Sequence, residues 1–293
     1  MGRVSPLISA ADLATALNEQ PPPVLLDVRW RLAGPPALPD YRSGHLPGAV
    51  FVDLATVLAD PPGAGGRHPL PEAGRLASAF AGLGVSDGSA VVCYDDDNGS
   101  IAARAWWLLR WLGLGRTDPR QVRVLDGGYA GWVAEGRPVS TEVPAPRPGT
   151  LTARPGSMPV LDADAAGELA LGGVLLDARA PERYLGETEP VDPRAGHIPG
   201  ARNAPFARHT GADGHWRPPA ELAGHYRALG VTGPDPVGAY CGSGVTATSV
   251  VFALEYAGLR SPDRPAALYT GSWSQWSADP ERPAAVGTES ERA

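Results

Sequence analysis

The stretch Tyr240-Cys241-Gly242-Ser243-Gly244-Val245-Thr246-Ala247 joins an apolar run at 236–240 to a helical run at 247–257. This pattern predicts a short buried strand, a tight loop and a helix, with a cysteine at the point where the strand ends. Glycine lets such a loop curl until backbone N–H groups converge on one point, and the helix start adds its positive end. Together these features favour a thiolate, the nucleophilic form of cysteine.

The second half of the chain repeats the first. Two pairs of matching segments are Val24-Leu25-Leu26-Asp27-Val28-Arg29 with Val174-Leu175-Leu176-Asp177-Ala178-Arg179, and Gly44-His45-Leu46-Pro47-Gly48-Ala49 with Gly196-His197-Ile198-Pro199-Gly200-Ala201. In the same alignment Asp95 stands opposite Cys241. A repeat of this kind indicates two copies of one structural unit.

Each half alternates short apolar runs with helical runs. Helices are expected at 9–18 and 162–171, and each precedes a strand that ends in Asp. Strands separated by helices predict an α/β fold of mostly parallel sheets flanked by helices. We expect an N-terminal domain at 1–140, a Pro-rich linker at 141–156, a C-terminal domain at 157–278 and a polar tail at 279–293.

Composition excludes several classes of function. The formal net charge is -7 and all 25 basic residues are Arg, so no Lys can act as a nucleophile and nucleic acid is not an expected partner. No apolar run is long enough to span a membrane, and the N-terminus lacks the apolar core of a secretory signal. Two cysteines leave one disulfide open but form no zinc-spaced cluster. A cytoplasmic protein without a metal or organic cofactor is expected.

The motifs resemble those of tandem-domain sulfurtransferases of the rhodanese superfamily, over nearly the full chain. The resemblance rests on His-Leu/Ile-Pro-Gly-Ala in both halves, Ala103-Arg104-Ala105-Trp106-Trp107, Gly271-Ser272-Trp273 and the Cys241 loop. It implies two rhodanese-like domains, of which only the C-terminal one is catalytic. In the inactive N-terminal domain of such proteins the cysteine is replaced, commonly by Asp, as at Asp95.

The two residues after the cysteine bear on the sulfur donor. Relatives that prefer thiosulfate typically carry basic residues there, whereas Gly242 and Ser243 are neutral and resemble the loop of 3-mercaptopyruvate sulfurtransferases. Cations stabilise the sulfite dianion that thiosulfate leaves behind. The resemblance therefore implies sulfur transfer from 3-mercaptopyruvate to thioredoxin, a small thiol or cyanide. Thiosulfate:cyanide sulfurtransfer is the alternative.

The resemblance also assigns roles within the site. Cys241 is the expected nucleophile, which becomes a persulfide in a double-displacement cycle. The loop residues expected to cradle that sulfur through backbone N–H groups are Gly242, Gly244, Val245 and Thr246. Arg183 matches the family's substrate-anchoring arginine, which holds a carboxylate through two parallel hydrogen bonds. Arg194 lies near a second such arginine, in a loop of different length.

Ser243 is expected to hydrogen-bond the donor thiol or to relay its proton. In 3-mercaptopyruvate enzymes this serine is thought to act with a His and an Asp from the N-terminal domain. His68 matches the His, but Ala55 stands where the Asp belongs. Asp53 lies two residues earlier in a strand-like stretch and would point to the opposite face. His68 is therefore expected in the pocket without a complete triad.

The two repeated histidines and the second cysteine are expected to have structural roles. His45 and His197 recur in both halves, so we expect them to brace loops, and we expect Cys93 in the core. A phosphatase with a related loop needs an arginine at the loop's far end, where Ala247 stands, which excludes phosphoryl chemistry. A low-turnover sulfur-relay protein on the same fold stays open, because the Asp partner of His68 is missing.

Overall fold

The computed structural model describes residues 5–288, which form two compact units. Of these residues, unit 1 takes 5–60, 71–157 and 210–217, and unit 2 takes 61–70, 158–209 and 218–288. Each half of the chain thus supplies a short segment to the other unit, and we call these segments arm 61–70 and arm 210–217. Residues 1–4 of the predicted N-terminal domain and 289–293 of the predicted tail lie outside the described residues.

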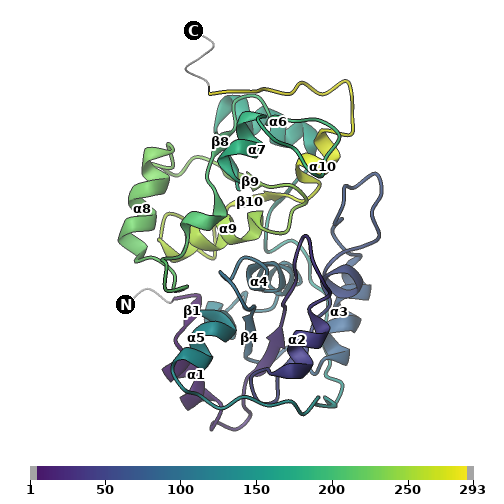
Figure 1. Cartoon of the computed structure of the whole chain (residues 1–293), viewed down its shortest axis with the longest axis vertical. Coiled ribbons are helices and arrows are strands. Elements are labelled where there is room, and N and C mark those ends of the chain that lie inside the picture. Colours follow the sequence, from purple (N-terminus) through teal and green to yellow (C-terminus); the bar gives the residue numbers. More distant parts are fainter. Residues whose placement is uncertain (1–4, 289–293) are drawn as a thin grey trace. The chain divides into compact units, whose positions relative to one another are not determined.

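Unit 1 contains, within the described residues, a parallel sheet with the strand order β1-β5-β4-β2-β3. Strands β1 and β4 of this sheet and helices α1 to α5 are labelled in Figure 1. Its strands are β1 (Leu7–Ile8), β2 (Val24–Asp27), β3 (Val50–Phe51), β4 (Val91–Tyr94) and β5 (Val122–Leu125). Its helical elements are α1 (Ala10–Ala16), α2 (Leu38–Ser43), the π-helix η1 (Leu54–Leu58), α3 (Ala73–Gly82), α4 (Ala102–Trp111), the 3-10 helix η2 (Pro119–Gln121) and α5 (Gly128–Ala134). Helix α4 packs on β4 and β5.

Unit 2 repeats this arrangement with the strand order β6-β10-β9-β7-β8. Its strands are β6 (Val160–Leu161), β7 (Val174–Asp177), β8 (Arg202–Asn203), β9 (Val237–Tyr240) and β10 (Ala267–Tyr269). Its helical elements are α6 (Ala163–Gly172), α7 (Pro181–Leu185), the 3-10 helix η3 (Phe206–Arg208), α8 (Pro219–Ala228), α9 (Ala247–Tyr256) and α10 (Ser272–Trp276). The predicted α/β class with helix-flanked parallel sheets is confirmed.

Local sequence explains where the first helix of each unit begins. Ser9 caps α1 by accepting the Asp12 N–H at 3.1 Å, and Asp162 caps α6 by accepting the Ala165 N–H at 2.8 Å. The strands that follow, β2 and β7, have almost wholly buried residues, as expected for strands covered on both faces. The predicted helices at 9–18 and 162–171 are therefore confirmed, although α1 is shorter at both ends and α6 is displaced by one residue.

A buried ion pair closes the same turn in both units. Arg29 binds the Asp27 carboxylate at the end of β2, and Arg179 binds Asp177 at the end of β7, with Nη2–Oδ2 distances of 2.7 and 2.6 Å. Each guanidinium also donates to the carbonyl of the glycine that precedes the loop histidine, at 2.7 Å. The strand end and the next loop are thus fixed together.

The two repeated histidines brace loops, as expected. His45 stacks on Tyr41 with ring centroids 4.0 Å apart, and His197 stacks on Tyr184 at 3.8 Å. Each Nδ1 lies within hydrogen-bond distance of the carbonyl of the same tyrosine, at 2.8 and 2.7 Å. The backbone of each histidine also pairs with a later segment, at Ser140 in unit 1 and Ala285 in unit 2.

That later segment closes each unit in the same way. Trp132 Nε1 donates to the Pro138 carbonyl and Trp276 Nε1 to the Pro283 carbonyl, both at 2.7 Å. In unit 2 the Gly287 N–H also donates to the Leu185 carbonyl at 2.8 Å. The described part of the predicted tail therefore wraps unit 2 rather than fraying.

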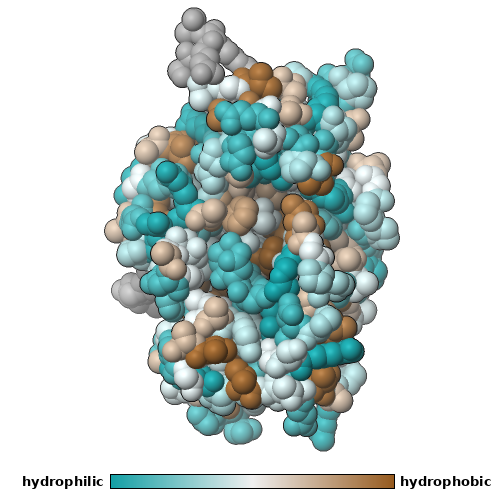
Figure 2. Space-filling model, in the orientation of Figure 1, coloured by the Kyte–Doolittle hydropathy of each residue, from teal (hydrophilic) through white to brown (hydrophobic). Residues whose placement is uncertain are grey.

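The surface gives no sign of a membrane-spanning helix. Within residues 5–288 no helix combines the length and the apolar character needed to cross a bilayer. On the face shown in Figure 2, hydrophobic side chains form small patches scattered among hydrophilic ones.

We expect His197→Ala to lower the free energy of unfolding by about 1–3 kcal/mol, because it removes both the stacked ring and a buried hydrogen bond. His45→Ala makes the matched change in unit 1 and should have a similar effect. Urea denaturation of both variants checks this expectation. Unchanged midpoints in both would show that these histidines do not brace the loops.

Candidate active site

The order of the strands places Cys241 beside the loop that follows β7. Strand β9 lies between β10 and β7, and Tyr240 is the register partner of Asp177. The chain leaves β7 toward β8 on one side and returns to β9 on the other, and ligand sites of parallel sheets form where the strand order reverses in this way. The segments after Asp177 and after Tyr240 therefore face each other at the carboxyl ends of their strands.

The backbone of Cys241 is held on both sides by the start of α10. Its N–H donates to Ser272 Oγ at 3.1 Å, and its carbonyl accepts the Trp273 N–H at 2.9 Å. Its Sγ accepts the Gly244 N–H at 3.2 Å, and the residue is only 2% exposed. The thiol thus sits at a fixed point with a backbone donor aimed at it.

Gly244 allows this contact because of its backbone conformation. Its φ is +78°, in the left-handed region, and a Cβ there would collide with the Thr270 carbonyl oxygen. Unit 1 has the corresponding turn at Gly99, with φ +75°. The loop that follows the central strand therefore curls in the same way in both units.

Unit 1 shows what this curled loop binds when the cysteine is absent. The Asp95 carboxylate accepts hydrogen bonds at 2.9 to 3.1 Å from the backbone N–H groups of Asp97, Gly99, Ile101 and Ala102. Burial raises the pKa of Asp95, although these four donors oppose the shift. The loop after β4 is therefore a ring of backbone donors around an acceptor side chain.

Arm 61–70 brings His68 to the cysteine loop. His68 Nδ1 lies 2.8 Å from Ser243 Oγ, within hydrogen-bond distance. The arm is fastened to α10, because the Arg67 N–H donates to Ser274 Oγ at 3.0 Å and Gln275 Nε2 donates to the Ala64 carbonyl at 2.9 Å. Two residues predicted for the site, His68 and Ser243, are thus in direct contact.

The segment around Asp53 differs from the expected strand. Strand β3 ends at Phe51, and Asp53 is the N-cap of η1. Its Oδ1 accepts both the N–H and the hydroxyl of Thr56, each at 2.9 Å. The carboxylate of Asp53 therefore caps a helix in unit 1, and the expectation of a strand there is wrong.

Two guanidinium groups border Gly242, the residue after Cys241. Arg183 Nη1 lies 3.5 Å, and Arg67 Nη2 3.0 Å, from the position that a Cβ on Gly242 would occupy. Arg183 comes from α7 and was expected in the site. Arg67 comes from arm 61–70 and was not singled out from the sequence.

Alternating charges connect these arginines to the end of β7. The consecutive ion pairs are Asp177–Arg179 at 2.6 Å, Arg179–Glu189 at 3.4 Å, Glu189–Arg183 at 2.6 Å, Arg183–Asp192 at 3.1 Å and Asp192–Arg67 at 2.5 Å. We call these six residues the charge chain. Burial alone would lower the pKa of Arg179, but the opposite charge and the hydrogen bonds of Asp177 outweigh this effect and raise it. The three arginines and three carboxylates give the charge chain a net charge of zero.

Arg194 does not reach the cysteine loop as a free anchor. Its guanidinium donates at 2.6 to 3.0 Å to the backbone carbonyls of Trp276, Ser277, Asp279 and Arg282. These bonds tie the loop after α7 to the chain that follows α10. Arg194 thus has a bracing role, which corrects the expectation of a substrate contact, and we leave it out of the proposed donor site.

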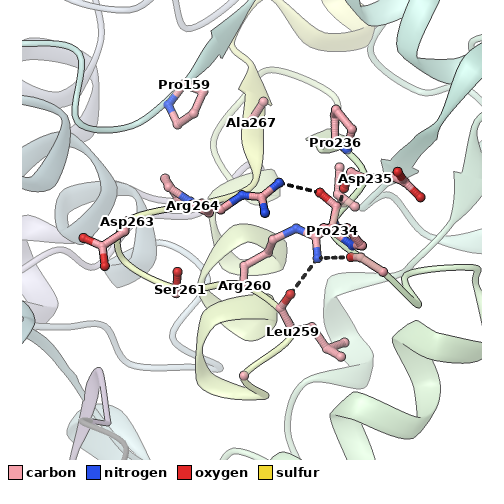
Figure 3. Close-up of a pocket in the computed structure, with 14 residues that line it drawn as sticks. Pro159, Pro234, Asp235, Pro236, Leu259, Arg260, Ser261, Asp263, Arg264 and Ala267 are labelled. Atoms are coloured by element: carbon pink, nitrogen blue, oxygen red, sulfur yellow. Dashed lines mark hydrogen bonds between the residues drawn. The ribbon is translucent and has the colours of Figure 1, made fainter.

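A cavity of about 500 Å³ lies at the opposite, amino end of β9 and β10 (Figure 3). Its two arginines are committed to backbone carbonyls: Arg260 donates to Asp235 at 2.6 Å and Arg264 to Pro234 at 2.7 Å. These bonds pin the loop before β9. Cys241 lies at the other end of β9, away from this cavity.

Comparison with known proteins agrees with the geometry. Residues 9–135 and 162–279 each match the rhodanese-like domain family. The chain belongs to this family. It is 45% identical to a Pseudomonas aeruginosa protein assigned as a 3-mercaptopyruvate sulfurtransferase, over 96% of this chain and 98% of that one. It is 43% identical to SseB of Mycobacterium tuberculosis, assigned as a thiosulfate sulfurtransferase, over 96% and 97%.

A solved structure supports the assignment to the rhodanese-like family. SseA from Escherichia coli, described as a 3-mercaptopyruvate sulfotransferase with the rhodanese fold, superposes with a TM-score of 0.78 at 30% identity, covering 92% of this chain and all of that one. The curated relatives of this rhodanese-like chain include sulfurtransferases with either donor name.

Sequence reasoning missed several residues of this rhodanese-like site. Ser272 is left-handed with φ +53°, matching Gly128 with φ +53° in unit 1, so the internal repeat held a signal for it. Arg67 adjoins His68, which the resemblance did identify. Glu189 and Asp192 had no signal, because charged residues in an irregular loop are usually solvated.

We expect Gly244→Ala to abolish most activity and to lower the melting temperature, because the added Cβ meets a backbone oxygen and the left-handed conformation alone costs about 1–2 kcal/mol. Gly242→Ala is the matched control, since its Cβ would press only on side-chain ends. The control should keep a nearly normal melting temperature and raise KM for the donor. Equal stability of the two variants would contradict this view of the loop.

Proposed function

We propose that this protein is a sulfurtransferase that moves a sulfane sulfur from 3-mercaptopyruvate to a thiol or cyanide through a persulfide on Cys241. The observation that carries the proposal is the position of two guanidinium groups, Arg67 and Arg183, beside the neutral Gly242. A carboxylate held there brings a thiol three carbons away within reach of Cys241. The neutral loop suits a donor whose charge is on its carboxylate rather than on its transferred group.

The first half-reaction balances without a cofactor. The Cys241 thiolate attacks the donor sulfur, the C–S bond breaks, and its electron pair goes to the carbon to form the enolate of pyruvate. The thiol proton of the donor moves to that carbon, which gives pyruvate and leaves the persulfide anion on Cys241. In the second half-reaction an acceptor thiolate or cyanide takes the outer sulfur and restores the thiolate.

The proposed donor anchor is the pair Arg67 and Arg183. Arginine forms two parallel hydrogen bonds with a carboxylate, which fixes the orientation as well as the position of the donor. Holding the reacting sulfur atoms in line accounts for a large part of the rate of such reactions. In this proposal the donor carboxylate lies on the guanidinium pair and its thiol lies over Cys241.

The proposed persulfide cradle is the loop Gly242, Gly244, Val245 and Thr246. Support comes from Asp95 in unit 1, whose carboxylate extends two atoms beyond Cβ and accepts four backbone N–H groups. A cysteine persulfide also ends two atoms beyond Cβ. We propose that the terminal sulfur on Cys241 takes the place that the Asp95 oxygens occupy in the corresponding loop, where N–H donors stabilise its charge.

Ser243 and His68 are proposed to transfer the thiol proton of the donor to the enolate carbon. The hydroxyl of Ser243, hydrogen-bonded to His68 Nδ1, can accept the thiol proton and return it to the enolate carbon. The imidazole keeps the hydroxyl oriented even though Ala55 replaces the expected Asp. Thiosulfate has no such proton at neutral pH, so this relay serves only a thiol donor.

Thiosulfate:cyanide sulfurtransfer is the second candidate, favoured by the donor name of the Mycobacterium tuberculosis relative. A low-turnover sulfur relay on the same site is the non-enzymatic alternative.

We further propose thioredoxin or a small thiol as the acceptor in a cytoplasmic setting. Support comes from the two buried cysteines, which are both free thiols, as in a reducing compartment. Cys93 is wholly buried, as expected for a core residue, and burial raises the pKa of its thiol.

We expect kcat/KM for 3-mercaptopyruvate to exceed that for thiosulfate by at least about tenfold, because the neutral loop and the guanidinium pair fit a carboxylate donor. Steady-state assays with both donors measure this ratio. Without an acceptor, intact mass spectrometry should show one added sulfur on the wild type and none on Cys241→Ser. A reversed donor ratio favours thiosulfate, and sulfur on the serine variant removes Cys241 as the nucleophile.

We expect Ser243→Ala to lower kcat with 3-mercaptopyruvate by about 10- to 100-fold, because the proton relay is lost. With thiosulfate as the donor the same variant should change kcat by less than about threefold. His68→Gln should follow the same pattern with a smaller loss. An equal loss with both donors would mean that the pair shapes the loop rather than moving a proton.

A further inference from the structure

Asp192 divides one carboxylate between the two guanidinium groups of the anchor. Its Oδ1 binds Arg67 Nη1 at 2.5 Å, and its Oδ2 binds Arg183 Nη2 at 3.1 Å. The side chain is only 2% exposed. A carboxylate that is desolvated to this degree is held in place by its partners, and it holds them in return.

Arg67 depends on Asp192 for its position. Within residues 5–288, Asp192 is the carboxylate with which Arg67 forms an ion pair, and Arg67 Nε is buried without a hydrogen-bond partner. Arg183, by contrast, has a second partner in Glu189 at 2.6 Å. Neutralising Asp192 therefore leaves the Arg67 guanidinium without its counter-charge, while Arg183 keeps that of Glu189.

The loop before Asp192 fixes this carboxylate in advance. The N–H groups of Val191 and Asp192 donate to Glu189 Oε1 at 3.1 and 3.0 Å. On the far side of the loop, Arg194 is bound to the chain after α10. Asp192 is thus placed by a turn that both ends of the loop support.

Asp192 also determines how much positive charge a donor meets. The charge chain has no net charge, so a bound monoanion adds one uncompensated charge and a dianion adds two. Because Coulomb energy scales with the charge of the ligand, the carboxylate of Asp192 disfavours a dianion twice as strongly as a monoanion. This difference acts in a partly buried site, where solvent screens it weakly.

We infer that Asp192 is a positioning residue that places Arg67 in the anchor and selects monoanionic over dianionic donors. The inference rests on the proposed function, and it names the group that sets donor choice within that site. Neutral residues at 242 and 243 withhold positive charge from the cysteine loop, and Asp192 offsets the charge that the anchor itself brings.

The test compares Asp192→Asn with Arg67→Gln. Asp192→Asn leaves one uncompensated positive charge, and we expect the ratio of kcat/KM for 3-mercaptopyruvate over thiosulfate to fall about tenfold. Arg67→Gln leaves one uncompensated negative charge, and the ratio should rise. Competitive inhibition gives an independent readout, because Asp192→Asn should tighten binding of sulfate more than binding of pyruvate.

The controls separate charge at the anchor from other effects. Asp164→Asn removes the same charge from an exposed pair with Arg282 in unit 2 and should leave the ratio within about twofold of the wild type. Asp192→Glu restores the charge and should return the ratio toward the wild-type value. Circular dichroism and melting temperatures confirm folding, and Arg67→Gln still decides the matter if Asp192→Asn does not fold.

The outcomes distinguish this inference from the proposed function. Ratios that shift in the same direction, or not at all, in folded Asp192→Asn and Arg67→Gln overturn the role of Asp192 while sulfur transfer by the wild type stands. A wild type that takes no sulfur from 3-mercaptopyruvate overturns the proposed function itself. Opposite shifts in the two variants support the inference, because a merely structural role would not change sign.

Discussion

The buried pair of Asp177 and Arg179 is the interaction from which the site is built. The carboxylate ends a central strand, and the guanidinium ties it to the next loop and to Glu189. A buried ion pair of this kind adds little net stability compared with apolar residues packed in the same place. Removing one partner is nevertheless costly, because it leaves the other charge buried and unpaired. Its effect is geometric: every later charge in the chain to Arg67 takes its position from the end of β7.

Local patterns were sufficient to predict the architecture. Residues close together in sequence determine each of these features: the buried apolar strands that end in Asp, the helices capped by Ser9 and Asp162, and the turn at Gly244. The pairing of Arg67 with Asp192 spans 125 positions between two irregular segments, and no periodicity records it. Arg194 was misassigned for a related reason, since its charge alone does not reveal that its guanidinium donates to four backbone carbonyls.

The two units illustrate how one loop serves two purposes. Around Asp95 the converging N–H groups meet an acceptor that is already part of the chain, so the loop is closed and structural. Around Cys241 the N–H of Gly244 is directed at the sulfur. One side chain thus separates a loop closed on its own carboxylate from a loop that surrounds a thiol.

Arm 61–70 has a consequence for the history of the chain. A single ancestral unit had to supply every part of its own site, but after duplication this protein takes His68 and Arg67 from the half whose loop carries Asp95. The half with Asp95 therefore cannot be lost as a redundant copy, although its own loop has no reactive group. A cut at the linker would separate the Cys241 loop from the segment that contacts it, so exchange of this ten-residue segment ties the two copies together.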